Sequence, residues 1–220
     1  ATGDEIVPPA ATPQPGQVRD LNSYALAAAI QGLGAIPRRL GIIPDDLDAL
    51  RAAARAGLES SDLLLVSAGS SVGARDLAAG VIQELGEPGV LVHGVDIRPG
   101  KPTIFALCSG KPVFGLPGQP VSVLNTFDQF VAPVLRRLLH HSTPPPTVSA
   151  RLAEAIRSAD GREDHVRVAL EERSDGWWAH PILGVSAMIT TMTRADGMTV
   201  IPAGTPGVAA GETVTVRLLV

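Results

Sequence analysis

The sequence predicts an α/β protein: a three-layer domain with a mostly parallel sheet, followed by a small β-rich C-terminal domain. Short apolar runs alternate with helical patterns over the first two-thirds of the chain, as they do in stacked βαβ units. Apolar residues make up 45% of the chain and aromatic residues only 3%, so Leu, Val, Ile and Ala must fill the buried strands. The three prolines at 144–146 then end this alternation.

Two helices are expected early in the first domain. Asp20 or Asn22 can cap a helix that stops at Gly34, because Asp and Asn are good N-terminal caps and Gly is a common C-terminal stop. Asp45 and Asp46 stand at the start of a second helix. We expect one of these two carboxylates to cap it.

The strands of this domain are expected where apolar runs are bounded by turn residues. These runs are 40–43, 63–66, 89–93, 103–107 and 112–116. Two further helices are expected, the first over 75–85. The second is long and amphipathic between Leu124 and Leu138, and Pro133 should bend it or end it early.

The proline run marks the clearest boundary in the chain. Three prolines remove three backbone donors and stiffen the chain toward polyproline II, so no helix continues through them. The pattern then changes to short strand candidates, namely 147–153, 163–171, 177–182, 197–201 and 212–219. We therefore expect an α/β domain over 1–143 and a small β-barrel-like domain over 147–220.

Charge and composition argue against several classes of protein. The net charge of −4, with no block of Lys or Arg, disfavours a partner bound by bulk electrostatics such as nucleic acid. Cys108 is the only cysteine, so no internal disulfide forms, and a cytoplasmic location fits. No apolar stretch reaches the roughly 18 residues that a membrane span requires. The five histidines lack the spacing of a zinc site.

The segment from Ser67 to Gly73 is a candidate anion site. A strand ends there, a loop of small residues that includes Gly69, Ser70 and Ser71 follows, and a helix begins directly after it. Such a loop can direct backbone N–H groups and the positive end of the helix dipole toward an anion. The alternative is an ordinary tight connection between a strand and a helix.

Carboxylates stand at three strand-to-helix junctions. Glu5 follows the expected N-terminal strand, Asp45 follows the second strand, and Asp76 follows the loop of small residues. Because the carboxyl ends of parallel strands share one edge of a sheet, these three acids could converge there and bind Mg²⁺. The alternatives are a capping role for Asp45 and a favourable charge in the first helical turn for Asp76.

Two rigid turns could form further walls of a site. Arg98 and Lys101 flank Pro99-Gly100 and could bind an oxyanion, or they could belong to a solvated turn. Pro102 excludes a phosphate-binding loop of the Walker type, which requires Ser or Thr at that position. Pro117 and Pro120 fix the loop over 115–122 more tightly than a plain turn needs, so we interpret it as a site wall.

The order of these motifs resembles the molybdopterin molybdenumtransferase family, which includes the E domain of gephyrin. The motifs are Thr2-Gly3-Asp4-Glu5, Asp20-Leu21-Asn22, 67–73 with Asp76, 99–102 and 115–122. After the prolines, the segments 182–188, 194–197, 200–202 and 211–214 resemble the C-terminal β domain of that family. The resemblance covers essentially the whole chain.

The resemblance implies a molybdopterin-binding-like fold and a role in molybdenum cofactor biosynthesis. Family enzymes act as homodimers, use Mg²⁺, insert molybdate into adenylylated molybdopterin, and release AMP. By this resemblance, Glu5, Asp45 and Asp76 would be the catalytic, metal-binding acids. The substrate-binding residues would be Ser67, Gly69, Ser70, Ser71, Gly73, Arg98, Lys101, Pro117, Pro120, Ser186 and Arg194.

The family also carries two further domains before the Thr2-Gly3-Asp4-Glu5 motif, so we expect a chain cut before Ala1. Its isolated form should bind ligand and catalyse poorly or not at all. One alternative is a molybdopterin adenylyltransferase, which shares the first fold but normally lacks a β-rich tail. Another is a non-catalytic scaffold, against which the complete set of acids argues. A third is a binding module only, which the missing N-terminal half would make it.

Overall fold

The protein is described from a computed structural model, which covers residues 1–67, 72–141 and 143–219, without the side chains of 72–76. The chain forms two compact units. The first comprises Ala1–Val95 and Gly100–His140, and the second comprises Asp96–Pro99 and His141–Val220. The short segment at 96–99 thus joins the second unit, a pairing that the expected division at the prolines did not include. No helix in the described part of the chain is long and apolar enough to cross a membrane.

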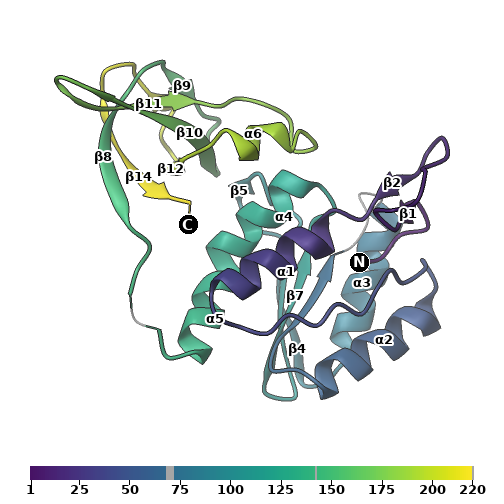
Figure 1. Cartoon of the computed structure of the whole chain (residues 1–220). Coiled ribbons are helices and arrows are strands. Elements are labelled where there is room, and N and C mark those ends of the chain that lie inside the picture. The colour runs from purple at the N-terminus through teal and green to yellow at the C-terminus, as the bar shows by residue number, and fades with distance from the viewer. Residues whose placement is uncertain (68–71, 142, 220) are drawn as a thin grey trace. The chain divides into compact units, whose positions relative to one another are not determined.

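The described residues of the first unit form a four-stranded mixed sheet (Figure 1). Its order is β3 (Leu64–Ser67), β7 (Lys111–Leu116), β6 (Ile104–Cys108) and β4 (Pro88–His93). β3 and β7 are parallel, whereas β7 with β6 and β6 with β4 are antiparallel.

The expectation of a mostly parallel sheet is therefore corrected. The reason is the two-residue turn Ser109-Gly110, whose φ angles of 51° and 79° are both positive. Turns of this kind join adjacent antiparallel strands, so β6 and β7 form a hairpin and not two crossover-connected parallel strands.

The strand expected at 40–43 is reduced to one isolated parallel bridge between Ile43 and Thr2. Gly41 has a φ of 91°, which takes the backbone out of the extended region. Pro44 has no N–H to donate to a ladder. Only Ile43 is left to pair.

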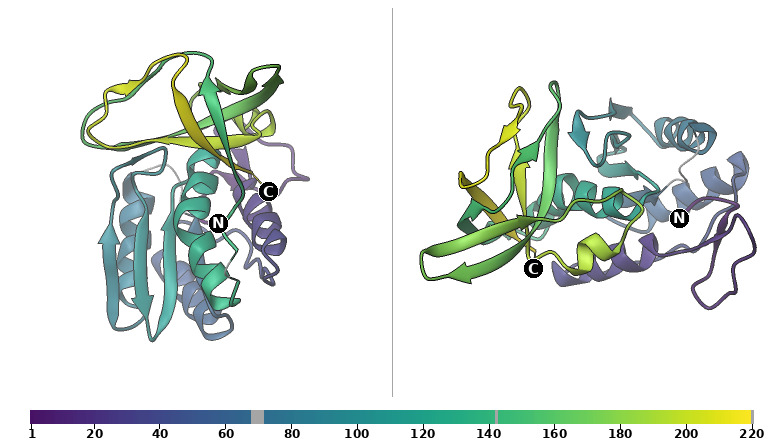
Figure 2. Two further views of the ribbon diagram at one scale, coloured as in Figure 1. Left: turned by 90° about the vertical axis from the view of Figure 1, so that its left-hand side faces the viewer. Right: turned by 90° about the horizontal axis from the view of Figure 1, so that it is seen from above.

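Helices cover both faces of the sheet, as the three-layer prediction requires (Figures 1 and 2). On one face, α2 (Leu47–Glu59) and α3 (Val72–Gln83) pack on Val66, Ala106 and Val113. On the other face, α1 (Asn22–Gly32) and the long helix over 120–138 pack on Phe114 and Leu116. Val113 of β7 therefore lies in one core, and Phe114 and Leu116 lie in the other.

Two details of the helices match the sequence. Asp46 caps α2, because its side chain accepts a hydrogen bond from the N–H of Ala49 at 2.8 Å. The long helix is divided into α4 (Pro120–Thr126), a π-helical turn (Phe127–Val131) and α5 (Ala132–Leu138). Pro133 cannot donate a bond to the preceding turn, and the π-helical turn lies directly before it.

The second unit is a β-barrel with one added strand. Its six-stranded sheet has the order β11 (Gly176–Pro181), β8 (Thr147–Leu152), β14 (Thr213–Leu218), β12 (Gly197–Ile201), β10 (Glu163–Arg173) and β5 (Ile97–Arg98). Pairing of β11 with β10 closes the barrel. Short β9 (Ile156–Arg157), β13 (Gly207–Val208) and α6 (Thr190–Thr193) complete the unit.

The barrel core is aliphatic, and exposed and buried residues alternate along most of β14. Leu152, Val168, Ala179, Ile201 and Val216 are completely buried. β5 pairs in parallel with the start of β10, with Ile97 beside Glu163, and Ile97 is itself buried. A strand of two residues from between β4 and β6 therefore completes an edge of the barrel.

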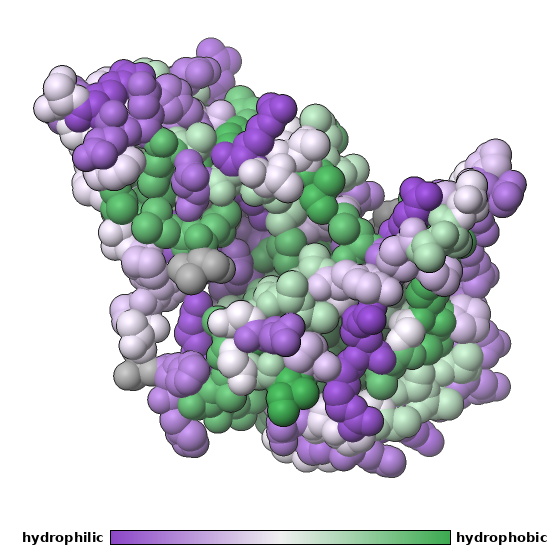
Figure 3. All heavy atoms as spheres, viewed as in Figure 1, coloured by the Kyte–Doolittle hydropathy of each residue, from purple (hydrophilic) through white to green (hydrophobic). Residues whose placement is uncertain are grey.

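Both units leave large apolar side chains exposed, and Figure 3 shows such apolar surface on one face of each. In the first unit, Ile36 is 90% exposed and Leu40 is 45% exposed. In the second unit, Leu183 is 72% exposed and Val185 is 64% exposed. Contiguous exposed apolar surface is typical of interaction sites.

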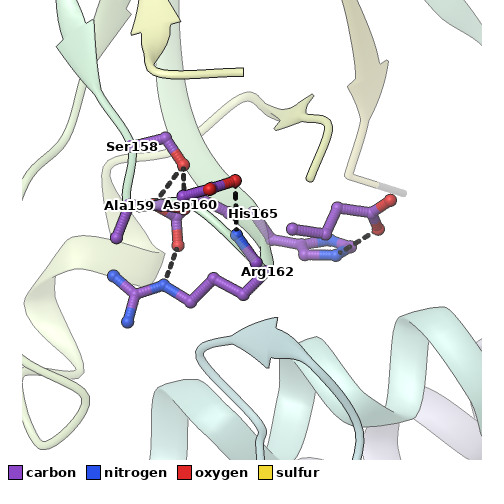
Figure 4. A network of polar contacts seen from close by, with 8 residues as sticks. Ser158, Ala159, Asp160, Arg162 and His165 are labelled. Atoms are coloured by element: carbon purple, nitrogen blue, oxygen red, sulfur yellow. Dashed lines mark hydrogen bonds and ion pairs between the residues drawn. The ribbon is translucent and has the colours of Figure 1, made fainter. Parts of the chain in front are cut away.

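The start of β10 carries a buried polar network (Figure 4). The Asp164 carboxylate accepts hydrogen bonds from Ser158 Oγ at 2.9 Å and from Arg162 Nε at 3.0 Å. His165 Nε2 lies 2.9 Å from Glu163 Oε1, and its side chain is only 2% exposed. Burial lowers the pKa of His165, although the Glu163 carboxylate opposes this effect.

The lowered pKa of His165 predicts a loss of stability in acid. Near and below the ordinary pKa of about 6.5, the unfolded chain binds a proton that the folded ring resists. Stability is therefore present above pH 6.5 and falls as the pH drops below it. His165→Gln removes this titration, so the melting temperature of the variant should fall less between pH 7.5 and 5.5 than that of the wild type. His93→Gln, at an exposed position, is the control, and an equal loss in His165→Gln would contradict the assignment.

Candidate functional site

The carboxyl end of β3 lies beside two other segments of the first unit. The N–H of Thr2 donates to the Ser67 carbonyl at 2.9 Å, and the N–H of Gly3 donates to the Ile43 carbonyl at 3.2 Å. Thr2 and Ile43 pair in the parallel direction. Segment 1–3 therefore lies between Ile43 and Ser67 at the same edge. The acids that follow Thr2 and Ile43 within two or three residues are brought to that edge.

Asp4, Glu5 and Asp45 interact there. The N–H of Asp45 donates to Asp4 Oδ1 at 3.1 Å. Partial desolvation raises the pKa of the Asp45 carboxyl, and the negative charges of Asp4 and Glu5 raise it further. Because Asp45 is exposed, solvent screens these effects. The structure thus brings Glu5 and Asp45 together and adds Asp4, which the sequence had not marked as a site residue.

Gly3 is needed for this arrangement. Its φ is 147°, and a Cβ atom at this position would lie 2.5 Å from Glu5 Oε2. No side chain fits at residue 3 unless the Glu5 carboxylate moves away. The glycine in the Thr2-Gly3-Asp4-Glu5 motif therefore makes room for the acid.

The chemistry of this edge suits a hard cation, since carboxylate oxygens are the preferred ligands of Mg²⁺. Thr2 Oγ1 is also buried and has no hydrogen-bond partner among the described atoms. However, the side chains that the structure describes include no group of three His, Cys, Asp or Glu that could hold a metal ion. Asp76 lies on α3, and its side chain is outside the described part.

A two-stranded parallel ribbon leads from the acids to α1. It consists of β1 (Ile6–Val7) and β2 (Val18–Arg19). The N–H of Val18 donates to the Glu5 carbonyl at 2.8 Å. Asp20, which is buried, accepts a hydrogen bond from the N–H of Ser23 at 3.1 Å, and its carboxylate also bonds the Ser23 hydroxyl. The backbone N–H of Ser23 at the start of α1 therefore donates to Asp20 and not to Asn22.

Asn22 instead connects the end of β3 with the loop that follows β7. Its Nδ2 donates to Ser67 Oγ at 3.3 Å and to the Gly118 carbonyl at 2.8 Å. Ser67 pairs with Leu116 in the parallel register of β3 and β7, so the ends of these two strands lie side by side. The sequence indicated Asn22 only as a possible cap. Its place in the ordered Asp20-Leu21-Asn22 motif was the one signal of a further role.

The other expected site residues of the first unit are placed as follows. Ser67 and Pro117 are buried, and Pro120 occupies the first turn of α4. Gly73 lies on α3, whereas Gly69, Ser70 and Ser71 fall outside the described residues. Lys101 is exposed.

The turn that carries Lys101 is anchored by buried hydroxyls. Thr103 Oγ1 donates to the Gly100 carbonyl at 2.6 Å and lies 3.2 Å from Thr126 Oγ1 of α4. The N–H of Val95 donates to the Lys101 carbonyl at 2.9 Å. These bonds fix the backbone from which the Lys101 side chain extends.

Three expected substrate-binding residues belong to the second unit. Arg98 is on β5 and exposed, Ser186 is half-buried in the segment before α6, and Arg194 is exposed at the end of α6. The convergence that the structure describes is thus confined to the first unit. It joins Glu5, Asp45, Ser67 and the loop at Pro117 through the contacts of Thr2 and Asn22.

Comparison with known proteins gives a consistent result over the two units. Residues 1–137 match the family described as a probable molybdopterin binding domain. Residues 149–219 match the MoeA C-terminal region, also called domain IV.

Several curated proteins are similar over nearly all of the chain. A putative molybdopterin biosynthesis protein of Methanocaldococcus jannaschii is 35% identical over 93% of this chain and 48% of its own length. Molybdopterin molybdenumtransferases of a Nostoc species and of Bacillus subtilis are 33% and 31% identical over 100% of this chain, and 52% and 51% of theirs. The chain therefore spans about half the length of the curated relatives that it matches.

Solved structures agree. A molybdopterin biosynthesis MoeA protein of Pyrococcus horikoshii has a TM-score of 0.86 and 41% identity, over 99% of this chain and 52% of that one. A molybdenum cofactor biosynthesis protein of Pyrococcus furiosus has a TM-score of 0.76 and 29% identity, over 91% and 65%.

The repulsion among the acids predicts a stabilising substitution. The raised pKa of Asp45 means that its charged form lowers the stability of the folded chain as the pH rises above about 4. Asp45→Asn should therefore raise the melting temperature at pH 7 by about 1 °C, and this difference should vanish below pH 4. Asp62→Asn, at an exposed position outside the cluster, should change neither value. A lower melting temperature of Asp45→Asn at pH 7 would show that Asp45 is not under net repulsion.

Proposed function

The chain belongs to the molybdopterin molybdenumtransferase family, and from that premise we propose that it inserts molybdate into adenylylated molybdopterin and releases AMP. Support comes from the match of both its regions to proteins of that name over the full chain. The chain spans about half the length of those relatives. The complete reaction is therefore part of this proposal.

The proposed substrates explain why donors and acids share one edge. Cleaving the adenylate breaks a bond between two phosphates, and the negative charge that develops on the leaving AMP must be stabilised. Molybdate is a dianion and also needs donors. Asn22 and Ser67 place an amide and a hydroxyl at the end of β3, and Lys101 adds a cation on a fixed backbone.

We propose Mg²⁺ as the metal ion, held by Glu5, Asp45 and Asp76 with Asp4 nearby. The raised pKa of Asp45 supports this, because the negative charges of Asp4 and Glu5 add to the effect of partial desolvation at this position. When bound, the ion would neutralise phosphate oxygens. Without it, like charges would repel an anionic substrate from the same edge.

The remaining assignments follow the same proposal. Substrate contacts are proposed for Ser67, Gly69, Ser70, Ser71, Gly73, Arg98, Lys101, Pro117, Pro120, Ser186 and Arg194.

A homodimer is supported by the exposed apolar residues Ile36 and Leu183, since large exposed side chains of this kind are commonly covered by a partner. A cytoplasmic location is supported by the presence of a single buried, unpaired cysteine.

A binding portion without catalysis is the second candidate. The observation in its favour is that the chain spans about half the length of the curated relatives that it matches. In that case the chain would bind the adenylylated pterin, and other parts of the full protein would complete the chemistry.

One titration separates these outcomes. The chain is titrated with adenylylated molybdopterin in the presence and absence of Mg²⁺, molybdate is added, and AMP is followed by chromatography. We expect Mg²⁺-dependent binding, weakened about ten-fold or more in Asp45→Asn and in Asp76→Ala. Asp62→Asn is the matched control for the loss of one surface carboxylate.

AMP release by the wild type would establish the proposed reaction for these residues. Binding without release would support the second candidate. If neither wild type nor control binds the adenylylated pterin, the assignment of the ligand site to this edge is wrong.

A further inference from the structure

We propose that Thr103 and Thr126 are positioning residues, which hold the backbone of Lys101 for the binding of an oxyanion. This inference rests on the proposed function, because Lys101 is one of the proposed substrate contacts. The side chain of Thr103 is 2% exposed and that of Thr126 is completely buried. Neither hydroxyl is at the surface, so both would act on the anion only through the turn that they hold.

Lys101 lies at the edge of the sheet where β3 and β7 end. β6 begins at Ile104, which pairs with Gly115 of β7, and Gly115 pairs with Val66 of β3. β6 is antiparallel to β7, so its first residue stands beside the last residues of the other two strands. The turn that leads into β6 therefore presents Lys101 at the proposed site edge.

The two buried hydroxyls form a hydrogen-bonded chain with one direction. Thr103 Oγ1 donates to the Gly100 carbonyl at 2.6 Å. A hydroxyl has a single proton, so Thr103 has none left for Thr126, and Thr126 Oγ1 must be the donor across the 3.2 Å between them. Thr126 of α4 thus orients the hydroxyl that bonds Gly100.

The backbone of Lys101 is also held on its other side. The N–H of Val95 donates to the Lys101 carbonyl at 2.9 Å, and the N–H of Gly94 donates to the Thr103 carbonyl at 2.8 Å. Pro102 restricts the residue before it to extended conformations. The carbonyls of residues 100, 101 and 103 are therefore all bonded, and the turn has little freedom to change shape.

The two threonines cost more than an apolar pair of the same shape. Burying a hydroxyl costs free energy that Val, with the same branching, does not incur. Val at residue 103 would, however, leave the Gly100 carbonyl without this bond. The hydroxyls are explained by the turn that they hold.

A held backbone matters for a flexible cation. The Lys side chain has four carbons, so the position of its Cα sets the region that the ammonium group can reach. When the turn is held, an anion orders only the side chain, whereas a loosened turn must be ordered as well, which weakens binding. The anion is molybdate or a phosphate of the adenylylated pterin, since both present charged oxygens.

The test compares variants that remove or keep the hydroxyls. Thr103→Val and Thr126→Val keep the shape and remove the donor, whereas Thr103→Ser keeps the donor. Ser61→Ala is the matched control, because it removes a hydroxyl that also donates to a backbone carbonyl, that of Gly57, at 2.6 Å. Ser61 precedes β3 and thus lies at the opposite edge of the sheet from Lys101.

Three measurements are made on the full chain. Hydrogen exchange of the Val95 amide reports whether the turn is held without any ligand. The dissociation constants of molybdate alone, and of adenylylated molybdopterin with Mg²⁺, show which anion the turn contacts. Each constant is also measured for Lys101→Ala and for the double variant Lys101→Ala with Thr103→Val.

We expect faster exchange of Val95 in both Val variants and about five-fold weaker binding of one of the two ligands. Thr103→Ser and Ser61→Ala should stay within two-fold of the wild type. The double variant should bind no more weakly than Lys101→Ala, because two residues that act through one contact are not additive.

Unchanged exchange in the Val variants would overturn the positioning role, whatever the ligands do. So would losses that multiply in the double variant, since the threonines would then act independently of Lys101. Binding of both ligands that Lys101→Ala leaves unchanged would also overturn it. A wild type that binds neither ligand would instead overturn the proposed function.

Discussion

The backbone hydrogen bonds of Thr2 and Gly3 determine where the acidic residues of this protein lie. They insert the first residues of the chain between Ile43 and Ser67, so that two separate acidic segments leave the sheet at one edge. Partial desolvation raises the pKa of Asp45, and the like charges of Asp4 and Glu5 at that edge raise it further. Side-chain attraction therefore does not hold the cluster together. The backbone pairing does, with Gly3 making room for Glu5.

A cluster of like charges held by the backbone lowers the stability of the folded chain and suits the binding of a ligand. Functional sites commonly keep groups with perturbed pKa values that cost the folded state free energy. Here a cation and an anionic substrate would relieve the repulsion together. The polar network around Asp164 in the second unit differs in kind, because each carboxylate oxygen of Asp164 has a donor. Asp164 is thus a satisfied buried group, and burial lowers the pKa of the neighbouring His165.

The sequence predicted much of the fold where local signals and burial agree. Asp46 was expected as a possible helix cap and is one, and the short strand candidates after the proline run correspond to the strands of the barrel. The direction of β6 and β7 was missed because a Ser-Gly turn was not weighed as a hairpin signal. β5 could not be foreseen, since a strand of two residues exists only through its distant partner on β10.

The site was predicted in part for the same physical reasons. Glu5 and Asp45 were expected at one edge and lie there, because the backbone pairing of Thr2 and Gly3 with Ile43 and Ser67 brings them together. Asp4 was passed over as the neighbour of Glu5, although its side chain bonds the backbone of Asp45. Asn22 was weighed as a cap, and its contacts with Ser67 and Gly118 depend on tertiary packing that spacing in the sequence does not show.

The central claim is that the acidic edge beside Ser67 holds the metal ion and the phosphates of the substrate. The most direct measurement is a crystal structure of the chain with adenylylated molybdopterin and Mn²⁺ in place of Mg²⁺, with the metal located by anomalous scattering. The account predicts a manganese peak among the carboxylates of Glu5, Asp45 and Asp76, with the phosphates between the loops after β3 and β7. A bound ligand whose metal and phosphates lie away from these carboxylates would contradict it.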